Sequence, residues 1–268
     1  LIALLIQLAA LDKSVVTVTP NFSLYGLDAK LLGAALTEVP LRSDLTVDMD
    51  GVIAATKAKG NAAAHAGGVV YLPQPHAPTG SILAASELQR VAEISGEWLV
   101  VIDEAYHQFA GTSSATLARS CPNVLILRTF SKAWGLAGLR LGYALASDEV
   151  ARHLRKLVPP FAISVMQQIA AEVALSNPGY MRERVERTIR ERERIALALR
   201  QHPTWEVYAS AANFLLIRTP DAARASEQLL QAGILVRRQD AYSSLAGCIR
   251  VTVGTPEEND LFLRATGL

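Results

Sequence analysis

The chain has 268 residues, half of them hydrophobic, and a formal net charge of +1 at pH 7. This length is enough for a substantial core in one or two domains, and the near-zero charge argues against a broad surface for nucleic acid. The two cysteines, Cys121 and Cys248, have no CxxC spacing, so we predict a reduced, cytoplasmic protein without a metal site.

The chain opens on the apolar stretch LIALLIQLAAL. A helix that spans a membrane needs about 20 such residues, and a signal peptide begins with a basic segment that is not found here. We therefore expect a buried helix and no membrane association. Because the sequence starts without methionine, we also expect it to be a fragment of a longer protein.

Short apolar runs alternate with amphipathic stretches through the first half of the chain. The candidate strands are Val15–Val18, Ala35–Val39, Val69–Leu72, Leu99–Ile102, Val124–Leu127 and Leu141–Ala146. The candidate helices are Leu24–Leu32, Met49–Lys59, Ala85–Ile94 and Glu149–Leu157. This alternation, with strands apolar on both faces, predicts an α/β fold in which helices cover a mostly parallel sheet.

The pair Pro159-Pro160 interrupts the helical pattern and predicts a boundary between a large domain, 1–160, and a smaller C-terminal α+β domain, 161–268. Its expected helices are Ser164–Leu175, Tyr180–Gln201 and Ala222–Gln231, the last closed by Gly233. Its expected strands are Trp205–Val207, Phe214–Ile217 and Ile249–Val253. The alternating Arg and Glu residues of the second helix indicate a solvated face with ion pairs along the helix, not a nucleic-acid-binding arm.

Two polar segments follow apolar runs of the large domain. WLVVI leads into Asp103-Glu104-Ala105-Tyr106, and VLIL leads into RTFSKAWGLAGLRLGY, which contains Lys132 and Arg140. Because ligands bind at the carboxyl ends of the strands in such sheets, we expect Asp103 and Lys132 to meet there. A lysine, a carboxylate, a hydroxyl donor and a Ser/Arg anion set are what pyridoxal 5′-phosphate requires, so the residues predict an enzyme that uses this cofactor.

With these segments in view, the whole chain resembles the fold-type I pyridoxal phosphate aminotransferases, and most closely their histidinol-phosphate aminotransferase branch. The matching pieces are TPNFSLY, the PTG of HAPTG, VVIDEAYHQFA, LRTFSKAWGLAGLRLGY, VPPF, SAANFLLIR, GILVRR and GCIRVTVGTPEEND. The resemblance implies a homodimeric enzyme of histidine biosynthesis. It would move an amino group between glutamate and a phosphorylated ketone.

The resemblance also implies a role for each matching residue. Lys132 would bind the cofactor covalently and then move the substrate proton, Asp103 would pair with the ring nitrogen, and Tyr106 would donate to the ring oxygen. The other cofactor contacts would be Phe22 on the ring face and Thr129, Ser131 and Arg140 at the phosphate. Each has a structural alternative, as a loop lysine, a turn aspartate or a core aromatic residue.

Two arginines match the family's contacts to the anionic groups of the substrate. Arg250 lies inside the apolar strand GCIRVTVGT, where a charge is unfavourable without an anion partner. Its planar guanidinium suits a carboxylate or a phosphate equally well. Arg237 of GILVRR matches a second contact, although its neighbour Arg238 could take that role, and a structural ion pair remains the alternative for Arg250.

The chain departs from the family pattern at two places. Ala77 precedes PTG where the family has an asparagine that donates to the cofactor ring oxygen, so Tyr106 would hold that oxygen alone unless His76 replaces the lost donor. The family's N-terminal segment, which supplies an arm over the site and part of the phosphate-binding loop, is not in this sequence. Two other functions stay open: a decarboxylase of a phosphorylated amino acid, and a degenerate, non-catalytic paralogue.

Overall fold

The structure is a computed structural model that describes residues 1–9, 14–57, 67–94 and 98–268. Its larger sheet has six strands in the order β2-β1-β3-β4-β5-β6. The strands are β1 (Ser14–Thr19), β2 (Ala35–Pro40), β3 (Gly68–Pro73), β4 (Trp98–Asp103), β5 (Val124–Thr129) and β6 (Gly142–Leu145). All neighbouring pairs are parallel except β5 and β6, which form an antiparallel pair. The predicted mostly parallel sheet is therefore confirmed.

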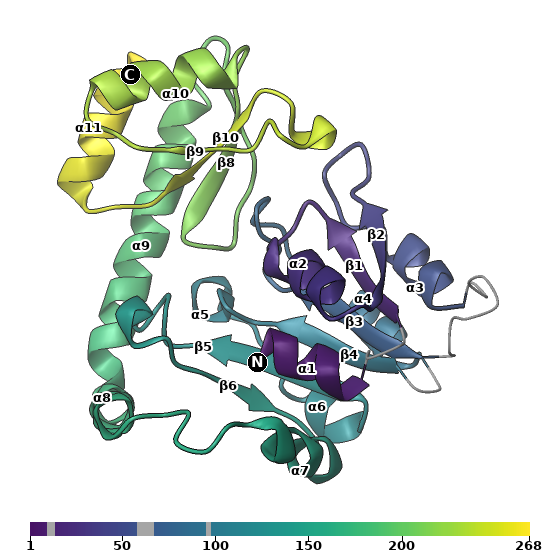
Figure 1. The fold of residues 1–268 in the computed structure, drawn as a ribbon. Coiled ribbons are helices and arrows are strands. Elements are labelled where there is room, and N and C mark those ends of the chain that lie inside the picture. Colours follow the sequence, from purple (N-terminus) through teal and green to yellow (C-terminus); the bar gives the residue numbers. More distant parts are fainter. Residues whose placement is uncertain (10–13, 58–66, 95–97) are drawn as a thin grey trace.

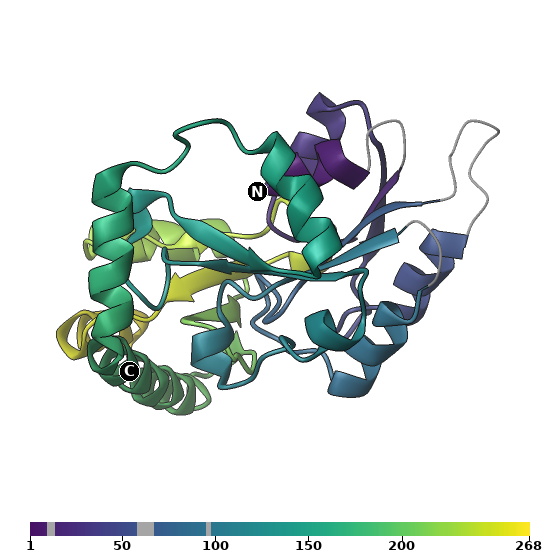
Figure 2. The same cartoon turned by 90° about the horizontal axis from the view of Figure 1, so that it is seen from below.

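Helices cover both faces of this sheet. The helices of the first half are α1 (Ile2–Ala9), α2 (Leu24–Leu31), α3 (Met49–Lys57), α4 (Ala85–Ala92), α5 (His107–Ala110), α6 (Leu117–Ser120) and α7 (Asp148–Leu157). Seen from below, α1 and α7 lie on one side of the sheet and α3 and α4 on the other (Figure 2). The last two residues of the predicted helix 49–59 lie outside the described residues.

Successive side chains of the central strands point to opposite faces of the sheet, as the pleat of a strand requires. Val100 and Ile102 of β4 pack in the cluster beneath α3, α4 and α6. Leu99 and Val101 pack in the opposite cluster, beneath α1, α2 and α7. This alternation decides which way the polar residues that follow each strand will point.

The order of the strands predicts the position of the site. Because β1 lies between β2 and β3, the connections on its two sides leave the sheet in opposite directions. Ligands of open parallel sheets bind at such a switch point, beyond the carboxyl ends of the strands. The segments that follow β1 and β3 there are Pro20–Phe22 and Gln74–Gly80, and Asp103 ends the next strand, β4.

The predicted N-terminal helix is confirmed as α1. Its Leu5 and Ile6 are fully buried in the cluster that covers one face of the sheet. The carbonyl of Ile2 accepts a hydrogen bond from the hydroxyl of Tyr71 on β3 at 3.0 Å. Among the described helices, none is both long and apolar enough to cross a membrane.

A second sheet has four strands in the order β7-β8-β10-β9. The strands are β7 (Glu206–Val207), β8 (Phe214–Arg218), β9 (Arg237–Arg238) and β10 (Cys248–Thr252), all antiparallel. The helices of this half are α8 (Val165–Ser176), α9 (Pro178–Leu199), α10 (Ala222–Gln231) and α11 (Pro256–Thr266). The predicted α+β composition is present, but α11 and the two-residue β9 were not predicted. The boundary at residue 160 stays a prediction.

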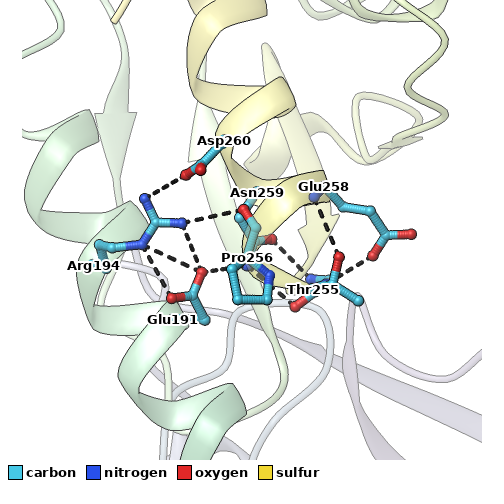
Figure 3. A network of polar contacts seen from close by, with 8 residues as sticks. Glu191, Arg194, Thr255, Pro256, Glu258, Asn259 and Asp260 are labelled. Carbon is cyan, nitrogen blue, oxygen red and sulfur yellow. Dashed lines mark hydrogen bonds and ion pairs between the residues drawn. The ribbon is translucent and has the colours of Figure 1, made fainter.

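The long helix α9 connects the two halves of the molecule, running from beside the large sheet to the small one (Figure 1). Figure 3 shows how it is joined to α11. Arg194 of α9 places Nη1 2.8 Å from Asp260 and Nη2 2.7 Å from Glu191, and Glu191 accepts a further hydrogen bond from Asn259 at 2.8 Å. This network fixes α11 against α9.

Candidate active site

Lys132 lies in a tight turn at the carboxyl end of β5. The turn is closed by hydrogen bonds from the Ser131 amide to Thr129 Oγ1 (3.0 Å) and from the Gly135 amide to the Lys132 carbonyl (2.9 Å). Gly135 has a φ of +71°, in the left-handed region that favours glycine. The side chain of Lys132 is exposed, with Nζ 5.4 Å from the centre of the Tyr106 ring.

Asp103 ends β4 beside this turn, and both of its carboxylate oxygens accept a hydrogen bond. The hydroxyl of Tyr25 donates to Oδ2 at 2.6 Å, and the amide of Ala105 donates to Oδ1 at 3.0 Å. Burial raises the pKa of Asp103, and the Tyr25 and Ala105 hydrogen bonds and the Lys132 charge only partly oppose this rise. A carboxylate in this setting is complementary to a cationic partner such as a protonated ring nitrogen.

The neighbouring Glu104 points to the opposite face of the sheet. It is fully buried and forms an ion pair with Arg128 of β5, whose Nη2 lies 2.9 Å from Oε2. The hydroxyl of Ser113 and the amide of Ser114 complete the contacts of this carboxylate. Glu104 thus has a full set of partners within the chain and no capacity left for a ligand.

Arg140 follows a 3-10 turn, η1 (Ala137–Leu139), and has left-handed backbone angles with φ of +52°. Its guanidinium donates to the Ala137 carbonyl at 3.1 Å, and within the described residues no carboxylate lies at ion-pair distance from it. Gln167 at the start of α8 supports the turn by donating to the Leu139 carbonyl at 2.7 Å. An exposed arginine held in this way can bind an anion.

Arg250 reaches the same site from the small sheet. Its guanidinium lies 5.0 Å from the centre of the Phe214 ring, and Phe214 in turn contacts the Tyr106 ring edge to face at 5.3 Å. Burial, with a smaller contribution from the charge of Arg237, lowers the pKa of Arg250. The two aromatic rings therefore connect the small-sheet arginine to Lys132.

Arg237 lies directly opposite Arg250 in the register of β9 and β10. Residues directly opposite on adjacent strands point to the same face, and like charges in that position repel each other. Neither arginine has a carboxylate at ion-pair distance in the described part of the chain. Arg238, in contrast, is bound by Asp240 at 2.6 Å. Between the two candidates that the sequence left open, this geometry favours Arg237.

Phe22 and the PTG turn border the site near the switch point. The side chain of Phe22 is 46% exposed and contacts Tyr25 edge to face at 5.8 Å, so its ring is open to a ligand. His76 is buried, and its Nδ1 is 2.8 Å from Thr79 Oγ1. Burial lowers the pKa of His76 to about 4. Because Nδ1 of His76 already contacts Thr79 within the turn, it does not replace the donor that is missing at Ala77.

Two contributors, Tyr25 and Phe214, were not identified from the sequence. Both lie within segments that carried the resemblance, TPNFSLY and SAANFLLIR, but buried aromatic residues have no pattern that separates a site contact from ordinary core. A usable signal exists for Tyr25, which follows Phe22 by three positions. The Tyr25 amide donates to the Phe22 carbonyl at 3.1 Å in the turn that leads into α2, and the two rings meet edge to face.

Fold and site together define a class, an α/β enzyme of fold type I. Residues 1–265 match the family model "Aminotransferase class I and II". The chain therefore belongs to this family, as the sequence predicted. It is 47% identical to the histidinol-phosphate aminotransferase of Deinococcus radiodurans over 99% of this chain and 72% of that protein.

Solved structures agree with this assignment. The histidinol-phosphate aminotransferase of Sinorhizobium meliloti, solved in complex with pyridoxal 5′-phosphate, is 28% identical and covers 99% of this chain and 72% of its own, with a TM-score of 0.88. The L-threonine-O-3-phosphate decarboxylase of Porphyromonas gingivalis has the same fold, with a TM-score of 0.81, 20% identity, and coverage of 99% and 78%. The likeness to the decarboxylase is evidence for the fold alone.

Proposed function

We propose that this chain is a pyridoxal 5′-phosphate-dependent aminotransferase that acts on histidinol phosphate, with 2-oxoglutarate and glutamate as the second substrate pair. The observation that carries the substrate class is the pair Arg237 and Arg250. Two cations that face each other without a carboxylate are complementary to a strongly anionic group such as a phosphate. The 47% identity to a histidinol-phosphate aminotransferase supports the same substrate.

The residues fit the ring nitrogen, the phosphate and the ring face of the proposed cofactor. Asp103 is a partly buried carboxylate whose hydrogen-bond donors, Tyr25 and Ala105, are both uncharged, which suits a protonated ring nitrogen. Arg140 provides a cation for the phosphate. Thr129, the last residue of β5, and Ser131, in the turn that follows, provide hydroxyl groups. Phe22 offers an open ring face. The one poor match is Ala77, which leaves Tyr106 as the donor to the ring oxygen.

The chemistry follows from these positions. When bound, the cofactor supplies an electron sink for the negative charge that develops on the substrate Cα. Lys132 Nζ would hold the cofactor and, once released, take the proton from Cα, because its amine lies beside the Tyr106 ring. Arg250 and Arg237 would bind the anionic end of the substrate, and Asp103 would keep its charge opposite the ring nitrogen.

The test is an absorbance spectrum of the purified protein with pyridoxal 5′-phosphate, recorded before and after histidinol phosphate is added. We expect a band for the lysine-bound cofactor that disappears with histidinol phosphate and returns with 2-oxoglutarate. The band should be missing in Lys132→Ala and retained in Lys30→Ala, an exposed lysine of α2. If histidinol phosphate leaves the band unchanged and the protein releases carbon dioxide from a phosphorylated amino acid, the protein is a decarboxylase and not a transaminase.

We also propose a homodimer, supported by an unpartnered apolar face on and before α8. None of the residues of α8 is buried. The exposed apolar side chains there are Phe161 at 100%, Met166 at 72%, Val165 at 68% and Val173 at 58%. A surface of this kind marks an interaction site. Sedimentation should give a dimer that Met166→Glu weakens and that Leu230→Glu, an exposed leucine of α10, leaves intact; a monomeric wild type would contradict the proposal.

A further inference from the structure

Tyr25 contacts Asp103 directly, although it was not among the site residues predicted from the sequence. It lies on α2, is fully buried, and donates its hydroxyl proton to Asp103 Oδ2 at 2.6 Å. The two residues are 78 positions apart in the chain. They meet because Asp103 shares the strand parity of Leu99 and Val101, whose side chains face α2.

The phenol is held in one place by its neighbours. Its ring stacks on the Tyr71 ring with centroids 4.7 Å apart and an angle of 6° between the planes. The hydroxyl of Tyr71 is itself bound to the Ile2 carbonyl at 3.0 Å. Tyr25 is therefore packed against a ring that is itself bound to α1, and its hydroxyl is directed at Asp103.

The proton in this hydrogen bond stays on the tyrosine. Burial and the nearby Asp103 charge raise the pKa of Tyr25 well above its ordinary value, so the phenol donates and the carboxylate accepts. The other titratable groups that act on Asp103 are Lys132, which favours its charged form, and Glu104, which opposes it. A hydrogen bond to the charged form of an acid stabilises that form.

From this geometry we propose that Tyr25 is a positioning residue, which orients the Asp103 carboxylate and keeps it ionised for the ring nitrogen of the cofactor. The inference rests on the proposed function for the partner of Asp103, but the hydrogen bond itself can be tested without cofactor. Tyr71 provides a matched control, because it has the same ring in the same stack and its hydroxyl binds Ile2 in place of Asp103.

The first experiment follows the Asp103 carboxyl carbon by ¹³C NMR during a pH titration of the cofactor-free protein, assigned with Asp103→Asn. In Tyr25→Phe we expect the Asp103 pKa to rise further, and in Tyr71→Phe we expect it to stay at the wild-type value. Site-specific 3-fluorotyrosine at position 25, which keeps the ring and donates more strongly, should move the pKa downward. The fluorotyrosine protein still tests the proposal if Tyr25→Phe does not fold.

The second experiment adds ¹⁵N-labelled pyridoxal 5′-phosphate and reads the protonation of its ring nitrogen, again by NMR. We expect a protonated nitrogen in the wild type and in Tyr71→Phe. Tyr25→Phe should lose part of that protonation and bind the cofactor about tenfold more weakly. An Asp103 pKa that is the same in Tyr25→Phe, fluorotyrosine protein and wild type would overturn the inference. A wild type that does not bind the cofactor at Lys132 would overturn the proposed function and leave the carboxyl titration intact.

Discussion

Asp103 and Glu104 are adjacent in the chain, yet they lie in opposite kinds of environment. Glu104 is bound by Arg128 at 2.9 Å and has serine donors in addition, whereas the two hydrogen-bond donors of Asp103 are uncharged. The first carboxylate completes a buried ion pair, and the second keeps its charge for a partner outside the chain. The difference separates a structural charge from a functional one more clearly than burial does.

The same distinction applies to the arginines. Arg128 and Arg238 each have a carboxylate within 3 Å, while Arg140, Arg237 and Arg250 have none at ion-pair distance in the described ranges. Of these five arginines, the three without an ion-pair partner are those that the resemblance assigned to cofactor and substrate. Within this comparison, the lack of an ion-pair partner among the described residues separates the candidate site arginines from Arg128 and Arg238.

The largest effect is expected at Lys132, whose amine would do the covalent chemistry. Lys132→Ala should lower the rate of amino transfer by about a thousandfold or more, because both the attachment point and the base are lost. Single-turnover measurements with glutamate, read by absorbance, test this. Lys30→Ala should behave as wild type, and a Lys132→Ala protein with normal turnover would remove this residue from the mechanism.

Replacing each of the two adjacent carboxylates by an amide, one at a time, tests the comparison directly. Glu104→Gln should lower the free energy of unfolding by about 3–5 kcal/mol, because Arg128 would be left without its counter-charge. Asp103→Asn should leave urea unfolding of the cofactor-free protein close to wild type or slightly stabilised, since it removes a charge whose pKa burial has raised. Asp103→Asn should instead lower the rate of amino transfer. Equal destabilisation by both variants would contradict the distinction.

His76 tests how a buried titratable side chain affects stability. Its Nδ1 contacts Thr79 Oγ1, and its Nε2 has no hydrogen-bond partner among the described residues. Its pKa is lowered from 6.5 to about 4 by burial, so the unfolded chain takes up the proton first. The stability that His76 contributes is complete above pH 6.5 and is lost as the pH falls toward 4. This loss is on the order of 3 kcal/mol. Urea unfolding of wild type and His76→Gln between pH 7 and 4 should diverge in this window, and parallel curves would show that His76 is not the cause.

The smallest effect distinguishes the two neighbouring arginines of β9. Arg237→Gln should raise the KM for histidinol phosphate by about tenfold, because one charge-assisted contact to the substrate is lost. Arg238→Gln removes an exposed ion pair with Asp240 and should change KM little. Steady-state kinetics of the two variants decide between them. A larger KM effect at Arg238 would reverse our assignment.

Much of the fold could be predicted from the sequence because its signals are local. The six strands of the large sheet and most of the long helices follow from apolar runs and their periodicity, and Ala222–Gln231 was predicted with the bounds that α10 has. Elements of two to four residues, such as β9 and α5, are too short to produce a periodic pattern. Helix α11 had a usable signal that was not applied, the capping box of Thr255 and Glu258 after Gly254.

The sequence by itself determined the α/β alternation, the position of Asp103 and Lys132 after buried strands, and the set of residue types that a pyridoxal phosphate site needs. Only the tertiary structure decided which charges are matched. Strand periodicity sends Asp103 and Glu104 to opposite faces, but the groups waiting there, Tyr25 and Arg128, come from 78 and 24 positions away. Contacts over such distances depend on how helices and strands pack, and that information is not contained in any local pattern.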